Sequence, residues 1–246
     1  MIKIENIDIY GWEAAIRGMR NPMNSWEKSD SGFGCGDNYE KPDIAFCDRC
    51  ASSFDCHGHG SHYIIGPNDL DLMKRLVKGG PVHAKFRRMI NVTMDITAPL
   101  YWWKEEDTYR VGTVTNSCST MHKIQAKEFT LEDFSCEHIA DLDINPTKEK
   151  QESPCMHDFG EVLRWTIHEL NLARKLYLET NDKKYWWQMI QLLPSSYNQR
   201  RTVQLNYEVL SHMYHDRKDH KLDCWRDFCK VIEGLPYAEE LIVGKD

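Results

Sequence analysis

The chain has 246 residues, a formal net charge of -7, and 41% hydrophobic and 28% charged residues. This balance is typical of a globular protein with a sizeable core rather than a disordered chain. The negative charge argues against the broad basic face that non-specific nucleic-acid binding requires. No apolar run approaches the roughly 18 residues of a membrane span, and the first residues lack the apolar core of a signal peptide. We therefore expect no nucleic-acid or membrane partner and a cytoplasmic location.

The N-terminal half predicts strands separated by short helices. Residues 2–9 alternate apolar and polar side chains, as a strand does, and residues 12–19 predict a short helix. A second, amphipathic helix follows the capping sequence at residues 67–69 and ends at Gly79 and Gly80. Residues 86–97 are rich in β-branched residues and predict a strand.

Pro99 then suits the first turn of a short helix. We expect its aromatic run, Tyr101, Trp102 and Trp103, to belong to the core, and the alternative is a platform for a flavin ring. Residues 111–119 predict an extended loop or an edge strand.

The C-terminal third predicts helices. Helical patterns cover residues 159–180, 186–193 and 201–218, and Asp223 is placed to cap a last helix. In residues 159–180 the apolar side chains lie along one broad face. The fold class expected is α+β, with a small mixed or antiparallel sheet and packed helices. We expect one domain over residues 1–246, with a Cys/His-rich insert at about 30–65 and a surface excursion at about 125–158.

The insert carries a possible metal site. Cys47 and Cys50 have the Cys-x-x-Cys spacing of a zinc knuckle, and Cys35, Cys56 and several histidines lie nearby. Four such ligands in a stretch without periodicity predict a structural zinc held by Cys35, Cys47, Cys50 and Cys56, or by a neighbouring histidine in place of Cys56. The alternative is an insert with free, reduced thiols, as nine cysteines without a secretory signal allow.

Two segments further along carry polar groups suited to a nucleotide. If residues 206–217 are helical, Asn206, Leu210, Met213 and Arg217 share one face, and an amide and a guanidinium frame an apolar strip. Such a strip suits a planar ring with a phosphate at one end, although an ordinary core-facing helix gives the same pattern.

The second segment, residues 98–122, ends in a loop of small residues whose backbone N–H groups and hydroxyls could bind phosphate. In this loop Cys118 is either a reactive thiol or, as we favour, a buried inert one.

Together these segments resemble the flavin-dependent thymidylate synthases. Counting from Ala98-Pro99, residues 108–110 (Thr-Tyr-Arg) fall on the Arg-His-Arg triplet of that family, and Thr113 falls on the first serine that follows. Asn116 and Ser119 match the later Asn and Ser if one residue is inserted, and Thr115 and Cys118 fall there if none is. Downstream, LPSSYNQRRTVQLNYEVLSHMYHDRKDHK is similar to the family's Leu-Pro segment and the helix that follows it.

The resemblance implies roles for particular residues. Arg110 and Arg217 would be the catalytic cations. His83, Arg110, Thr113 and Asn206 would contact FAD, and Arg110, Asn116, Ser119 and Arg217 would bind the nucleotide. The implied reaction transfers a one-carbon unit from methylenetetrahydrofolate to C5 of dUMP or a related pyrimidine nucleotide, through FAD that NADPH reduces, in a homotetramer.

The chain departs from the family at several cations. Thr108 and Tyr109 replace the first two residues of the triplet, and Glu208 stands where arginine is usual. Each change removes a charge-assisted bond worth roughly 1.5–3 kcal/mol. A non-catalytic protein of the same fold that binds a flavin or a nucleotide therefore remains the alternative to an enzyme.

Overall fold

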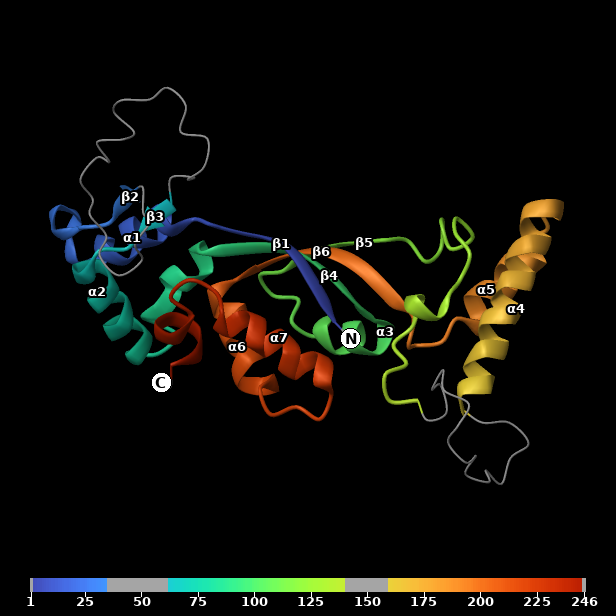
Figure 1. The fold of residues 1–246 in the computed structure, drawn as a ribbon. Coiled ribbons are helices and arrows are strands. Elements are labelled where there is room, and N and C mark those ends of the chain that lie inside the picture. The colour runs from blue at the N-terminus through green and yellow to red at the C-terminus, as the bar shows by residue number, and fades with distance from the viewer. Residues whose placement is uncertain (1, 35–61, 140–158, 245–246) are drawn as a thin grey trace, which may run out of the picture.

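The structure, a computed structural model, describes residues 2–34, 62–139 and 159–244 (Figure 1). Its centre is a four-stranded antiparallel sheet in the order β1-β4-β6-β5. The strands are β1 (Lys3–Tyr10), β4 (Asn91–Pro99), β6 (Asn198–Asn206) and the edge strand β5 (Val114–Ser117). This architecture confirms the predicted α+β class.

One face of the sheet is covered and the other is open. Along β4, buried residues alternate with half-buried polar ones, as expected when only one face packs on a core. Helices α3 (Leu100–Glu106), α6 (Tyr207–Arg217) and α7 (Asp223–Glu233) lie on the covered side (Figure 1). Trp102, Trp103 and Trp225 are fully buried there, with Trp102 4.8 Å and 4.7 Å from the other two ring centroids. The expectation that the aromatic run belongs largely to the core is confirmed, with Tyr101 only partly buried.

The first helices pack at one end of this layer. They are α1 (Trp12–Arg20) and α2 (Pro67–Lys78), accompanied by a short hairpin of β2 (Gly32–Gly34) and β3 (His62–Ile64). Buried Arg20 of α1 donates to the fully buried Asp69 of α2 over 2.6 Å, and Ser29 and Ser31 donate to the other carboxylate oxygen. Because both carboxylate oxygens of Asp69 accept hydrogen bonds, this buried ion pair holds α1 and α2 against each other.

Helices α4 (Phe159–Thr180) and α5 (Lys183–Leu192) lie at the opposite end (Figure 1). They form a second core with residues from the segment before them, among which Phe129 and Phe134 are buried. Of the expected surface excursion, residues 125–139 are described; many of them are exposed, and Phe129 and Phe134 connect this segment to the core formed with α4 and α5. The face predicted for residues 159–180 is divided, because Leu163, Leu170 and Ala173 are buried whereas Val162, Trp165 and Leu172 are exposed.

Two predicted elements are wrong in type. Residues 201–206 belong to β6, the strand between β4 and β5, and not to a helix. Residues 84–89 form a 3-10 helix, so the strand predicted from residue 86 begins only at Asn91. Pro99 is the last residue of β4 and precedes α3, rather than being its first residue.

No helix of the described residues is long and apolar enough to cross a membrane.

Candidate functional site

The loop of residues 107–113 joins α3 to β5 and carries several of the residues singled out from the sequence. The Tyr109 amide donates to the Glu106 carbonyl over 2.9 Å, and the Thr113 hydroxyl donates to the Tyr109 carbonyl over 3.0 Å. Gly112 has φ +81°, a conformation that other residues rarely adopt. These local bonds give the loop a defined shape.

Both ends of α6 contact this loop. At its start, the Asn206 side chain donates to the Gly112 carbonyl over 3.4 Å, and a Cβ at residue 112 would come within 2.9 Å of the same amide nitrogen. At its end, Arg217 Nε donates to the Tyr109 hydroxyl over 3.0 Å. The two segments that the sequence analysis linked to a nucleotide therefore meet in space.

Arg217 is already engaged within the chain. Its Nη1 donates to Glu105 Oε2 over 2.8 Å, and its guanidinium lies 4.9 Å from the Trp225 ring centroid and 5.6 Å from that of Tyr109. The same Glu105 oxygen accepts from Trp225 Nε1 over 3.0 Å. Arg217 thus fixes Tyr109 and the end of α3 by an ion pair and by stacking on aromatic rings.

A cavity of about 250 Å³ opens beside the loop, lined by Glu106, Asp107, Arg110, Thr113 and Thr115. The exposed Arg110 donates from Nε to the Asp107 carbonyl over 2.7 Å. Among the described residues its two terminal nitrogens have no hydrogen-bond partner. A guanidinium held at Nε with its outer nitrogens open is suited to bind an anion.

Glu106, which the sequence analysis did not select, lies in the same cavity. It is only 4% exposed, and its burial raises its pKa to about 7, helped by the neighbouring Asp107 and opposed by Arg201. A buried carboxyl with a strongly perturbed pKa in a cleft is a candidate functional group. The one signal in the sequence was a second glutamate directly after Glu105 at the end of a core helix.

Asn116 and Ser119 lie away from that cavity. Thr115 pairs with the buried Val203, whereas Asn116 pairs with Thr202, whose hydroxyl bonds to Asp95 on the open face of the sheet. Since successive residues of a strand point to opposite faces, Asn116 faces the open side.

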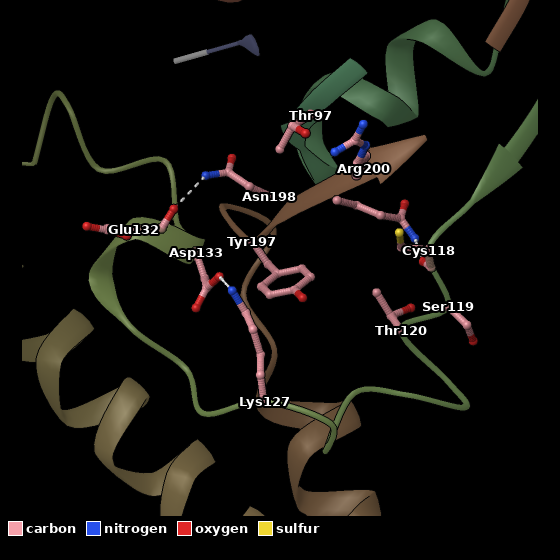
Figure 2. A pocket seen from close by; sticks show the side chains of 11 residues that line it. Thr97, Cys118, Ser119, Thr120, Lys127, Glu132, Asp133, Tyr197, Asn198 and Arg200 are labelled. Atoms are coloured by element: carbon pink, nitrogen blue, oxygen red, sulfur yellow. Dashed lines mark hydrogen bonds and ion pairs between the residues drawn. The ribbon is translucent and has the colours of Figure 1, made fainter. Parts of the chain in front are cut away.

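Ser119 lines a second cavity, of about 240 Å³, together with Cys118, Lys127, Tyr197 and Arg200 (Figure 2). Its hydroxyl accepts from the amides of Met121 and His122 over 3.2 Å and 2.8 Å. Cys118 is exposed, so the favoured prediction of a buried thiol is wrong: the cysteine follows the edge strand β5, whose four residues are all exposed.

Two further predictions lie elsewhere. His83 is exposed and precedes the 3-10 helix of residues 84–89, and within the described residues no hydrogen bond joins it to the loop of residues 107–113. Cys35, Cys47, Cys50 and Cys56 lie outside the described residues, so the zinc site stays a prediction. Elsewhere, the described residues hold no cluster of three or more potential metal ligands.

Solved structures share this architecture over nearly the whole chain. Thymidylate synthase X (ThyX) from Helicobacter pylori, solved with FAD and dUMP, superposes with a TM-score of 0.58 at 15% identity, covering 99% of this chain and 98% of that one. The UMP/dUMP methylase PolB from Streptomyces cacaoi, bound with 5-Br dUMP, gives 0.54 at 13% identity, covering 98% and 91%. The chain has the fold of the flavin-dependent thymidylate synthases. No family model matches the sequence, and no curated protein does.

The ThyX-like fold confirms the resemblance that the motifs suggested, although identity is low. At 13–15% identity, most side chains of this ThyX-like chain differ from those of the proteins it superposes on. The chemistry of its site therefore has to be argued from its own residues.

Proposed function

We propose that the protein binds a uracil nucleotide at the loop of residues 107–113 and methylates C5 of dUMP or a related pyrimidine nucleotide. The observation that carries the proposal is the open guanidinium of Arg110 beside a cavity of about 250 Å³. This volume lies below the roughly 300–1,000 Å³ typical of drug-sized ligands, so the cavity would enclose part of a nucleotide. Both similar structures, ThyX and PolB, were solved with a uracil nucleotide bound.

In this proposal the two arginines act differently. Arg110 binds the phosphate through its outer nitrogens, and the Thr113 hydroxyl lies at the same opening. Arg217 positions Tyr109 and the loop, and a direct contact between Arg217 and the nucleotide would require it to exchange its Glu105 partner. Asn116 and Ser119 would contact a nucleotide only where it extends past the edge strand to the open face.

The fold implies FAD, but the residues of a single chain do not form a complete site for it. The amide of Asn206, the residue matched to flavin contact, accepts from the Glu208 and Val209 amides and donates to Gly112, so it has little left to offer a ligand. His83 lies apart from the loop. FAD, NADPH and methylenetetrahydrofolate therefore remain co-reactants that the resemblance implies. Any FAD site would need groups from a second copy of the chain, as in the proposed homotetramer.

The test is titration calorimetry with dUMP on the parent, Arg110→Ala and Arg217→Ala, with Arg75→Ala as control. Arg75 is an exposed cation whose one ion-pair partner among the described residues is Asp71 on the same helix. Losing a charge-assisted phosphate contact in Arg110→Ala should weaken binding about ten-fold or more at unchanged stability. Arg217→Ala should weaken binding and also lower the free energy of unfolding by about 2 kcal/mol, because Glu105 loses its ionic partner.

Equal dUMP affinity in the parent and Arg110→Ala would remove Arg110 from the site. A parent that binds no uracil nucleotide would refute the proposal as a whole.

A non-catalytic, nucleotide- or flavin-binding protein is the second candidate, and one observation favours it. The side chains that replace family cations are tied into pairs within the chain: Tyr109 donates to Asp216, and Glu208 pairs with Arg88. The visible absorbance of the purified protein, and turnover of dUMP when the three co-reactants are supplied, separate the candidates. Bound ligand without dTMP formation would support the non-catalytic one.

A further inference from the structure

Glu106 is a buried acid for which the described residues provide no partner. It is the last residue of α3 and is 4% exposed, yet its carboxyl makes no hydrogen bond or ion pair with any described residue. Its side chain lines the 250 Å³ cavity beside Arg110. Neither carboxyl oxygen is among the fully enclosed polar atoms of the described residues that lack a partner, so the carboxyl is reached from the cavity and is open to a ligand.

The charged groups around Glu106 are engaged elsewhere. Asp107 accepts from Arg201 Nη1 of β6 over 2.9 Å, and the same Arg201 stacks on the Trp103 ring with its guanidinium 4.2 Å from the ring centroid. Arg110 points its Nε at the Asp107 carbonyl. The remaining lining residues, Thr113 and Thr115, are uncharged. Burial and Asp107 therefore favour the neutral acid, and Arg201 opposes them only partly.

A neutral carboxylic acid offers a donor and an acceptor side by side. That pair complements a ring amide, in which an N–H lies next to a C=O, and uracil presents this edge at N3. A carboxylate would offer two acceptors and would repel a phosphate. The free guanidinium of Arg110 at the same cavity supplies the complementary site for the phosphate.

We propose that Glu106 is a specificity-determining residue, whose neutral carboxyl binds the N3–H and adjacent C=O of the uracil ring. This inference rests on the proposed function and adds to it a residue that selects the base. It predicts that the protein discriminates against pyrimidines without an N3–H.

The experiment compares dUMP with N3-methyl-dUMP by calorimetry at pH 6.5. The variants are Glu106→Gln, which keeps a donor and an acceptor, and Glu106→Leu, which removes both. Glu27→Leu, at an exposed glutamate in a distant 3-10 helix, is the matched control.

The parent and Glu106→Gln should prefer dUMP over its N3-methyl analogue at least about ten-fold, because methylation removes a hydrogen bond to a buried group. In Glu106→Leu, dUMP binding should fall about ten-fold and the preference should disappear. Glu27→Leu should behave as the parent does.

Raising the pH gives an independent readout. Between pH 7 and 8.5 the affinity of the parent for dUMP should fall as Glu106 ionises, by up to ten-fold per pH unit, whereas that of Glu106→Gln should stay level. The phosphate titrates identically for all variants, so the difference between them reports Glu106 alone.

Several outcomes would overturn the inference. If Glu106→Leu binds dUMP and its analogue as the parent does, Glu106 does not contact the base, while the proposed function stands. Unchanged binding with lower thermal stability in Glu106→Leu would make it a structural residue. A parent that binds neither ligand contradicts the proposed function itself.

Discussion

Two adjacent glutamates show how strongly single side chains depend on their surroundings in this protein. Glu105 accepts hydrogen bonds from Arg217 and Trp225 and is part of a closed network. Glu106, one residue later, is buried among the described residues without a partner. The first stabilises the contact between α3 and α6, and the second makes the native state sensitive to pH.

The pH dependence of Glu106 follows from its raised pKa. The usual pKa of 4.5 rises to about 7 in the folded chain, so the native state binds more protons than the unfolded state between these values. The neutral form of Glu106 therefore contributes fully to the free energy of unfolding below pH 4.5, and this contribution is lost as the pH rises to about 7. At 1.36 kcal/mol per pKa unit, the loss from this residue is about 3 kcal/mol.

Urea unfolding of the parent and of Glu106→Gln from pH 4.5 to 8 measures this loss. The free energy of unfolding of the variant, relative to the parent, should rise by about 3 kcal/mol over that range and then level off. Parallel curves for the two proteins would show that Glu106 titrates normally in the folded state.

At the scale of elements, Asn206 joins β6, α6 and the loop of residues 107–113. Its side-chain oxygen accepts from the Glu208 and Val209 amides, which would otherwise lack a partner at the start of α6, and its nitrogen donates to Gly112. The residue matched to flavin contact is, in this chain, first of all a helix cap.

Replacing Asn206 should separate these roles. Asn206→Ala removes both the cap and the loop contact and should lower the free energy of unfolding by about 1–2 kcal/mol. Asn206→Asp keeps a capping oxygen and adds a favourable charge at the helix N-terminus, so it should lose less than half as much. Denaturant unfolding checks both values, and equal losses would mean that the Gly112 contact outweighs the cap.

At the scale of the molecule, α4 exposes apolar side chains away from its buried residues. Trp165 and Leu172, two turns apart on one side of the helix, are 56% and 42% exposed, whereas Leu163, Leu170 and Ala173 are buried. A pair of exposed apolar side chains at this spacing is suited to a protein–protein interface. It supports the proposed homotetramer, with α4 in contact with another copy of the chain.

Charged substitution on this face should change the oligomeric state. Trp165→Lys should shift the protein from a tetramer to smaller species in light scattering coupled to size exclusion, because a charge would be buried at the interface. Trp26→Lys, at a tryptophan of similar exposure far from α4, should leave the mass unchanged. A monomeric parent would contradict the proposal directly.

The sequence by itself determined much of the framework. Strand β1 and helices α1, α2 and α4 could be predicted because their apolar residues recur at the period of one element. The resemblance in two short segments was enough to identify the fold, and it correctly linked residues 98–122 with residues 206–217.

Only the tertiary structure decided the rest, for physical reasons that no local pattern contains. Residues 201–206 form an inner strand because β4 and β5 pair with them, and Arg201 is accommodated there by Asp107 and the Trp103 ring. Asn116 and Arg110 lie on different sides of the sheet edge. Side chains alternate between the two faces along β5, but the face of each one is known only once the pairing of β5 with β6 is known. The burial of Glu106 beside an open cavity likewise depends on what packs around α3, so its pKa and its proposed role follow from the fold alone.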